Sequence, residues 1–323
     1  MSDFDFNLPQ ELIAQTPARP RDHARLLIYD RRNQSIKDDY FYNLEKYLPA
    51  GTTLVLNNSK VEKARLRFGS SEIFIVESIN PTTVRAMIRP GKKFRVGVET
   101  DLGVLKVKTV EIDEQGLRTL SLSIPLDDMR LDNYRLTPLP PYIAQDESLS
   151  EEYQTVYARP LGSKAAPTAG LHFTSDQLEH IKKHWPVAEL TLHVGLGTFA
   201  PVKAENINEH IMHHEWYGVD ALAAKVINSA KHITAVGTTS ARTLESLNRP
   251  FKATSGQTNI FITPGYKFKN VDALVTNFHL PKSTLLMMVG ALIGSVDELH
   301  RIYSHAIANG YRFYSFGDAM LVL

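Results

Sequence analysis

The spacing of hydrophobic and polar positions changes along the chain, and each change predicts different elements. Near the start, the apolar segment Arg25–Asp30 and the segment Ser35–Tyr40 flank the polar residues 31–34, which predicts a β-hairpin. The apolar run 53–56 predicts a buried strand. We therefore expect strands mixed with short helices in this region.

Between residues 69 and 125 the apolar runs are short, and turn residues separate them. The runs occupy residues 72–79, 83–90, 93–98, 103–112 and 117–124. Such regular spacing predicts a small antiparallel barrel or sandwich. The fold class that we predict is therefore an α/β main domain of mixed strands and helices with an inserted small all-β barrel-like domain. Residues 1–66 and 135–323 would form the main domain, and residues 67–134 the insert.

The rest of the chain alternates between strand and helix patterns, which is typical of α/β folds. The predicted strands are residues 187–194, 233–236, 259–263 and 272–277, and the predicted helices are 175–184, 221–232, 239–247, 284–293 and 296–308. Thr174 and Gln177 form a capping-box pattern before the first of these helices. Asp220 and Ser283 are candidate N-caps of two others.

Composition narrows the class of protein. Hydrophobic residues make up 43% of the 323 residues, which excludes disorder as the main state. Lys and Arg number 36 against 35 Asp and Glu, so no basic field covers the whole surface. The absence of cysteine excludes disulfides, thiolate nucleophiles and Cys-ligated zinc. Without a signal-peptide pattern or an apolar stretch of membrane-spanning length, we expect a soluble cytoplasmic protein with no membrane partner.

Two loops bring a histidine together with small residues. His172 ends a loop that contains Thr168 and Gly170, where small residues let a backbone approach a ligand. His193 leads from a predicted strand into a glycine loop that contains Thr198 and Phe199. For both loops an ordinary structural turn is the alternative.

Two further loops stand between a strand and a helix. Thr238 and Thr239 open a helix that carries Arg242 in its first turns, a plausible seat for a carboxylate or phosphate. His279 and Lys282 follow the end of a predicted strand and precede a helix, which is typical of ligand sites in α/β proteins. Ordinary helix capping is the alternative for the first loop, and a structural loop for the second.

One cluster could ligate a metal. His210, His213 and His214 would share a face if they lay on a helix, and Glu215 follows them. The pattern is not H-E-x-x-H, and packed or hydrogen-bonded histidines are the alternative. We predict no metal.

Basic residues gather locally at 60–67 and 85–95, where Phe94 interrupts them. Such a stripe can follow phosphates although the total charge is near zero. A solvated strand face is the alternative.

Long ordered blocks resemble one family, the S-adenosylmethionine:tRNA ribosyltransferase-isomerases of queuosine biosynthesis, nearly from end to end. The matching blocks include DFDFNLPQELIAQTP (3–17), AAPTAGLHFT (165–174), LTLHVGLGTFAPV (190–202), HIMHHEWY (210–217), VGTTSARTLES (236–246), TNFHLPKSTLLM (276–287) and YRFYSFGDAML (311–321). The chain departs from the family in the run NNSKV at 57–61 and in its short β insert.

The resemblance implies a reaction and its partners. The ribosyl part of S-adenosylmethionine would be transferred to 7-aminomethyl-7-deazaguanine at the wobble position of tRNA and isomerised. The products would be epoxyqueuosine-tRNA, adenine and methionine. S-adenosylmethionine would be a co-substrate rather than a methyl donor, and the enzyme a monomer.

This chemistry needs a base to remove a proton activated by the sulfonium and acids to protonate the departing adenine, tasks that suit histidine. For proton transfer we predict His172, His193, Glu215 and His279. For substrate binding we predict Thr168, Gly170, Thr198, Phe199, Thr238, Thr239, Arg242, Tyr266, Lys282 and Ser283. For tRNA binding we predict Lys60, Lys63, Arg65, Arg89 and Lys92.

Two competing hypotheses come from other classes of protein. The first is a metal-dependent hydrolase that uses the cluster at 210–215. The second is an RNA-binding module without catalytic activity.

Overall fold

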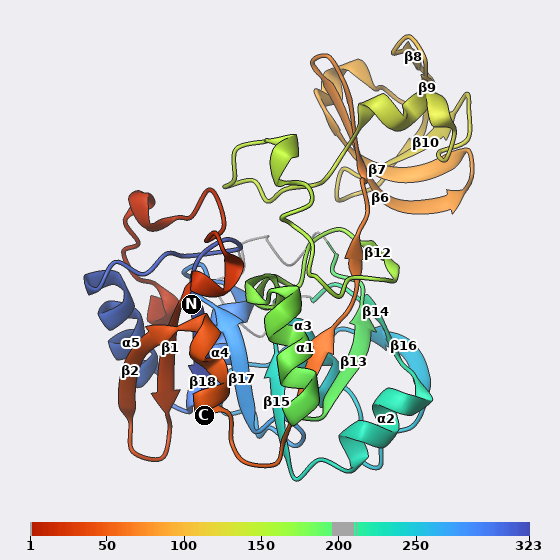
Figure 1. Cartoon of the computed structure of the whole chain (residues 1–323). Coiled ribbons are helices and arrows are strands. Elements are labelled where there is room, and N and C mark those ends of the chain that lie inside the picture. Colours follow the sequence, from red (N-terminus) through yellow and green to blue (C-terminus); the bar gives the residue numbers. More distant parts are fainter. Residues whose placement is uncertain (1, 196–209, 211) are drawn as a thin grey trace. The chain divides into compact units, whose positions relative to one another are not determined.

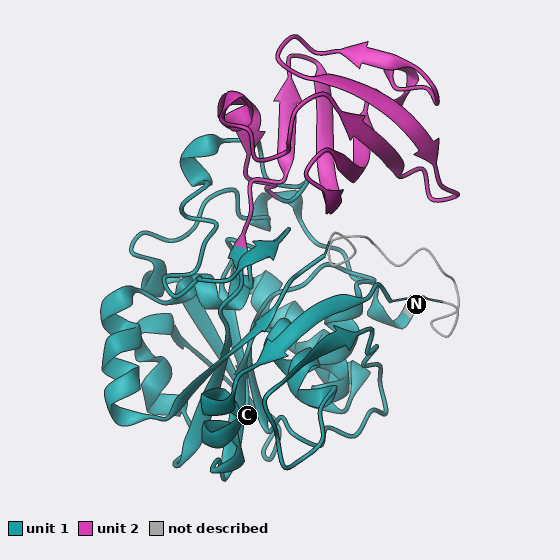
Figure 2. Ribbon diagram, turned by 90° about the vertical axis from the view of Figure 1, so that its right-hand side faces the viewer, with its two compact units in different colours: residues 1–60, 140–323 teal, residues 61–139 magenta. Residues whose placement is uncertain are grey.

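The computed structural model describes residues 2–195, 210 and 212–323, which fold as two compact units. Unit 1 comprises Met1–Lys60 and Pro140–Leu323, and unit 2 comprises Val61–Leu139 (Figure 2). The sequence predicted the two boundaries at 66/67 and 134/135. Among the described residues, no helix is long and apolar enough to cross a lipid bilayer.

Unit 1 is built on a mixed sheet (Figure 1). Within the described residues its strand order is β16-β14-β13-β3-β15-β17-β18-β1-β2. The bounds are β1 (Arg25–Asp30), β2 (Ser35–Tyr40), β3 (Thr52–Asn57), β13 (Val187–Leu192), β14 (Glu215–Val219), β15 (His232–Val236), β16 (Thr254–Thr258), β17 (Ala273–Asn277) and β18 (Ala319–Val322). The central strands β13, β3, β15 and β17 are parallel. The predicted hairpin of β1 and β2 is confirmed.

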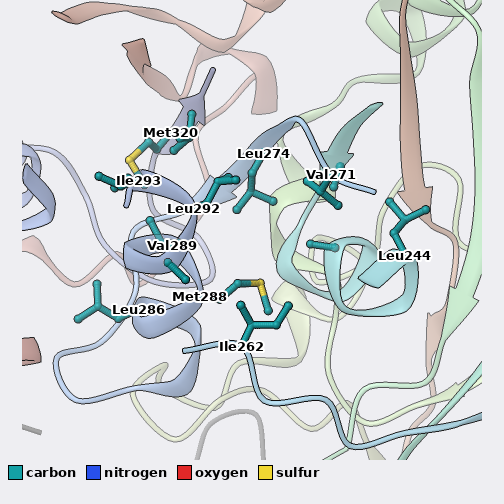
Figure 3. Packing of buried hydrophobic residues seen from close by; sticks show 14 of the residues in the cluster. Leu244, Ile262, Val271, Leu274, Leu286, Met288, Val289, Leu292, Ile293 and Met320 are labelled. Carbon is teal, nitrogen blue, oxygen red and sulfur yellow. The ribbon is translucent and has the colours of Figure 1, made fainter. Parts of the chain in front are cut away.

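Helices cover both faces of this sheet, so its inner strands β3, β15, β17 and β18 are buried on both sides. The α-helices are α1 (Ser175–His184), α2 (Ala221–Asn228), α3 (Thr238–Glu245), α4 (Thr284–Ile293) and α5 (Val296–Ala308). On β1, Leu27 and Tyr29 join the core on the side of α2 to α5, whereas Leu26 and Ile28 join the core on the side of α1. Figure 3 shows Val289 and Leu292 of α4 and Leu274 of β17 among the side chains of the first of these cores.

Unit 2 is a curled antiparallel sheet with the strand order β11-β5-β6-β7-β10-β9-β8 within the described residues (Figure 2). Its strands are β5 (Arg65–Phe68), β6 (Ser71–Asn80), β7 (Thr83–Arg89), β8 (Glu99–Asp101), β9 (Lys106–Ile112), β10 (Arg118–Leu122) and β11 (Arg135–Leu136). Residues 93–98 were predicted as a strand, and this was wrong. Phe94 is fully buried there, but the backbone makes a 3₁₀ turn, η5 (Gly91–Lys93), and a second turn at residues 96–97.

Two further expectations in unit 1 need correction. The strand predicted at 259–263 lies earlier, as β16, because the polar residues Thr254–Thr258 supply the backbone ladder to β14. The apolar Ile262 is instead buried by packing against the core (Figure 3). The second helix ends at Asn228 rather than 232, although Asp220 caps it as predicted, accepting a hydrogen bond from the Ala223 N–H.

The predicted caps of α1 and α4 are confirmed. Thr174 accepts a hydrogen bond from the Gln177 N–H, and Ser283 accepts one from the Leu286 N–H. The capping box is only half formed, because the Gln177 side chain donates to the carbonyl of Phe41 instead. Local sequence therefore positions both helix starts.

Candidate active site

The candidate site lies in unit 1, where parallel strands end. The carboxyl ends of β3, β13, β15 and β17 share one edge of the sheet, the usual place for ligands in α/β proteins. After β15 the chain turns at Gly237, whose φ of +87° favours glycine, and enters α3 directly. After β17 it passes His279 before α4 begins. The 3₁₀ turn η8 (Thr168–His172) contacts β17.

Three adjoining cavities occupy this edge. The charged cavity is lined by His210, Met212, His213, Glu215, Arg242, Thr284 and Leu285. The threonine cavity is lined by residues that include Thr168, Gly237, Thr238, Thr239, Asn277 and His279. The tyrosine cavity is lined by residues that include Tyr142, Thr168, Asn277, His279, Tyr314 and Ser315. Leu285 lines all three, so they adjoin one another at this side chain.

The charged cavity is centred on a buried ion pair. Arg242 and Glu215 are 4% and 5% exposed, and one guanidinium nitrogen of Arg242 donates to Glu215 Oε2. Glu215 Oε1 accepts a hydrogen bond of 2.8 Å from the Gly195 N–H. The other two guanidinium nitrogens of Arg242, Nε and Nη2, have no partner among the described residues. Burying unsatisfied guanidinium groups is costly, so this arrangement favours an anionic ligand.

The threonine cavity holds two buried oxygens without partners among the described residues, Thr239 Oγ1 and Asn277 Oδ1. The orientation of the Asn277 amide is fixed because its Nδ2 donates to the carbonyl of Tyr314 at 3.1 Å. The same nitrogen lies 3.1 Å from His172 Nε2, which must therefore accept. Asn277 was not predicted as a site residue, although it stands in the TNFHLPKSTLLM block.

His279 lines both the threonine and the tyrosine cavities. Its Nε2 lies 2.8 Å from Thr276 Oγ1, and its backbone N–H donates to the Tyr303 hydroxyl at 3.1 Å. Burial lowers the pKa of His279 to about 3. The imidazole is therefore neutral near pH 7.

His172 does not reach the cavities directly. It lies between Asn277, which lines two of them, and the ring of Phe41. Burial, with a smaller contribution from Arg312 and Arg21, lowers its pKa to about 3. None of the three cavities is lined by His172. In this structure it orients Asn277 rather than facing a ligand.

The tyrosine cavity was missed by sequence reasoning. The Tyr142 hydroxyl lies 2.7 Å from Ser315 Oγ, and the rings of Tyr142 and Tyr314 are 4.6 Å apart. Tyr314 has a φ of +73°, which is rare for an aromatic residue and often marks a functional site. The signal in the sequence was the block 311–321, which gave no role to individual residues.

Several predicted site residues lie outside the three cavities. His193 stacks on Trp216 at 5.0 Å, and its pKa is lowered by burial and by Lys164. The Tyr266 hydroxyl donates to Glu245, and burial with this bond raises its pKa to about 12. Lys282 pairs with Asp5 at 2.6 Å.

Of the remaining predicted residues, two make packing or capping contacts and two lie outside the part of the chain that the structure describes. Gly170 packs against Tyr157, so the close approach that needs glycine is to that side chain. Ser283 caps α4 and also lines the tyrosine cavity. Thr198 and Phe199 lie outside the described residues.

The histidine cluster does not lie on a helix. His213 and His214 lead directly into β14, and Glu215 is its first residue. Among the described residues, no group of three or more His, Cys, Asp and Glu could hold a metal ion. His210 and His213 instead line the charged cavity.

The residues predicted to bind tRNA differ in exposure. Lys60, Lys63, Arg89 and Lys92 are exposed. Arg65 is half-buried, pairs with Glu72 at 3.7 Å and lies over the ring of Phe74. The Arg65 guanidinium thus already has contacts within unit 2.

Comparison with known proteins decides the family. The sequence matches the model of the family described as "Queuosine biosynthesis protein" over residues 1–322. The chain belongs to this family. A relative from Staphylococcus saprophyticus is named S-adenosylmethionine:tRNA ribosyltransferase-isomerase. It is 45% identical over an alignment of 338 positions, gaps included, which covers 99% of this chain and 98% of that protein.

A solved member of the queuosine biosynthesis family has a similar fold. The crystal structure of S-adenosylmethionine tRNA ribosyltransferase from Thermotoga maritima matches with a TM-score of 0.57 and 36% identity. The match covers 99% of this chain and 100% of that one. The resemblance to the family that the sequence predicted is confirmed.

Proposed function

We propose that this chain transfers the ribosyl part of S-adenosylmethionine to 7-aminomethyl-7-deazaguanine at the wobble position of tRNA and isomerises it. The products are epoxyqueuosine-tRNA, adenine and methionine. The observation that carries the proposal is the family match over residues 1–322. The relative named S-adenosylmethionine:tRNA ribosyltransferase-isomerase, at 45% identity, supports it. The chain acts in the queuosine biosynthesis pathway.

The three cavities supply groups that fit S-adenosylmethionine. Its carboxylate needs a cation, which Arg242 offers through its unpartnered nitrogens. Its nucleoside carries hydroxyl and amine donors, which the oxygens of Thr239 and Asn277 can accept. S-adenosylmethionine supplies a sulfonium that makes neighbouring C–H bonds acidic. The residues present therefore fit this co-substrate, and we expect no metal.

His279 is the residue that we propose for proton transfer, because it is a neutral imidazole that lines two cavities. Thr276 Oγ1 holds its Nε2 at 2.8 Å and thereby orients the ring. Glu215 suits a positioning role, since both of its oxygens already accept hydrogen bonds. Roles for His172 and His193 in proton transfer stay predictions.

We further propose that unit 2 is a barrel-like insert that contacts the tRNA backbone through Lys63, Arg89 and Lys92, which are exposed. Lys60 of unit 1 is exposed as well and joins this set. The enzyme would act as a monomer in the cytoplasm, where its tRNA substrate is found.

A product assay tests the proposed reaction. Purified protein with S-adenosylmethionine and tRNA that carries 7-aminomethyl-7-deazaguanine should release adenine and methionine in equal amounts, measured by liquid chromatography. Release should continue in the presence of a chelator, which separates this activity from that of a metal-dependent hydrolase. The matched control is the same tRNA with guanine at the wobble position. No release with the modified tRNA would contradict the proposal.

The same assay tests His279. His279→Ala should lower kcat by about 100-fold or more, as expected for loss of a general base, with little change in the KM for S-adenosylmethionine. The matched control is His184→Ala, because His184 is exposed on α1. Near-native turnover of folded His279→Ala would remove its catalytic role.

A further inference from the structure

The three cavities differ in charge along their length. The charged cavity contains the Arg242–Glu215 ion pair. The threonine cavity contains hydroxyls, an amide and a neutral imidazole but no Lys, Arg, Asp or Glu among its described lining residues. Leu285 lines both, so the two cavities are neighbours, and we treat them as two subsites for one ligand. Such a ligand would be zwitterionic at one end and neutral at the other.

At the charged end, the unpartnered atoms are donors. Arg242 is 4% exposed, and its Nε and Nη2 point to an acceptor that the described residues do not supply. A carboxylate accepts from two guanidinium nitrogens at once. The ion pair as a whole is neutral, so an amino-acid group with one positive and one negative charge also matches it electrostatically.

At the neutral end, the unpartnered atoms include an acceptor whose position is fixed. Asn277 is 2% exposed, and its Nδ2 is engaged by Tyr314 and His172, so Oδ1 alone is left to accept a hydrogen bond. Thr239 is 7% exposed, and its hydroxyl has no partner among the described residues. These oxygens suit N–H and O–H donors, which a purine nucleoside carries on its base and its ribose.

We infer that S-adenosylmethionine binds in one orientation, with its amino-acid end against Arg242 in the charged cavity and its nucleoside against Thr239 and Asn277 in the threonine cavity. Asn277 Oδ1 accepts from an O–H or N–H of the nucleoside and is a specificity-determining contact. The inference rests on the proposed use of S-adenosylmethionine. It places the nucleoside beside His279, which lines the same cavity.

Two binding probes separate the ends of the ligand. S-adenosylhomocysteine carries both the amino-acid group and the nucleoside, whereas 5′-methylthioadenosine carries the nucleoside alone. Isothermal titration calorimetry with each probe needs neither tRNA nor turnover. The double variant Arg242→Met with Glu215→Gln removes both charges, which avoids leaving one of them buried without a partner.

For the charged end, the double variant should lower the affinity for S-adenosylhomocysteine by about 10- to 100-fold, since charge-assisted hydrogen bonds are lost. Its affinity for 5′-methylthioadenosine should change less than about twofold, because that probe makes no contact with Arg242. The matched control is Arg249→Gln, an exposed arginine of the same unit.

For the neutral end, Thr239→Val should lower the affinity for both probes by a similar factor of about 3 to 10. This variant breaks no bond of the Thr239 hydroxyl to the described residues, so it should stay folded. Asn277→Ala should likewise weaken the binding of both probes.

Three analogues of 5′-methylthioadenosine then identify the group that donates to Asn277 Oδ1. They lack the exocyclic amine, the 2′-hydroxyl or the 3′-hydroxyl. The analogue without the donating group should bind Asn277→Ala and the native protein equally.

The opposite orientation predicts the reverse pattern. If the double variant weakened both probes equally, or if Thr239→Val weakened S-adenosylhomocysteine alone, the inferred orientation would be overturned. Unchanged affinity for both probes in every folded variant would overturn it as well. The proposed reaction would survive each of these results, because release of adenine and methionine by the native protein tests it independently.

Discussion

Single residues in the site carry most of its electrostatic character. His172 and His279 are buried imidazoles that the fold keeps neutral, and burial holds the pKa of each at about 3, compared with 6.5 for an ordinary histidine. Between these two values the unfolded chain binds protons that the folded chain does not. The free energy of unfolding should therefore fall as the pH falls from 6.5 towards 3, by up to about 1.4 kcal/mol per pH unit for each imidazole.

A substitution isolates one of these contributions. In His172→Gln, the difference between the free energies of unfolding at pH 7 and pH 5 should shrink by about 2 kcal/mol, because one titrating group is lost. Urea unfolding at both pH values measures it. His184→Gln, at an exposed position of α1, is the control and should keep the native difference. An unchanged pH dependence in His172→Gln would show that this imidazole is not held neutral by the fold.

At the scale of elements, the turn η8 brings small residues close to neighbouring side chains. A methyl group at Gly170 would overlap the hydroxyl of Tyr157, which is 5% exposed and has no partner for that hydroxyl among the described residues. The small residue is therefore required for packing between η8 and the segment that carries Tyr157. The sequence had assigned it to close approach by a ligand.

This packing can be tested with a double-mutant cycle. Gly170→Ala should lower the free energy of unfolding by about 1–3 kcal/mol, as overpacking does in other cores. Adding Tyr157→Phe removes the overlapping oxygen and should restore part of the lost free energy of unfolding. Tyr157→Phe alone should change the free energy of unfolding little. Thermal and urea unfolding give both values. Additive effects of the two substitutions would argue that Gly170 is needed for another reason.

At the scale of the whole molecule, a net charge of +1 leaves tRNA binding to local basic residues. Lys63, Arg89 and Lys92 of unit 2 are exposed and can contact phosphates, whereas Arg65 has contacts within the unit. Few phosphate contacts predict an affinity that falls modestly with salt.

The double variant Arg89→Gln with Lys92→Gln should weaken tRNA binding and reduce the slope of log affinity against log salt by about 1.5 to 2, because two phosphate contacts are lost. Filter binding from 50 to 300 mM salt measures the slope. Lys231→Gln with Lys252→Gln, two exposed lysines of unit 1, is the control of equal charge. Equal slopes for the two double variants would exclude residues 89 and 92 as specific contacts.

The sequence by itself determined the family and the local elements. The N-cap residues Ser283 and Asp220 were identified correctly, because a cap and its helix lie within a few residues of each other. The ends of α1, α4 and α5 followed from the helical period in the same way. Residues 259–263 were wrongly predicted as a strand. Their apolar side chains pack in the core without strand pairing, and in the sequence such a run has the same pattern as a buried strand.

Only the tertiary structure decided which polar atoms face a ligand. Asn277 meets His172 across 105 residues of chain, and Arg242 meets Glu215 across 27, so no local pattern reveals that one is left with a free acceptor and the other with free donors. Hydrogen-bond partners are assigned by the folded arrangement of distant segments, whereas caps and periods depend on neighbours. For this reason the sequence predicted which loops form the site, whereas the structure was needed to identify the polar atoms of these loops that are free to bind a ligand.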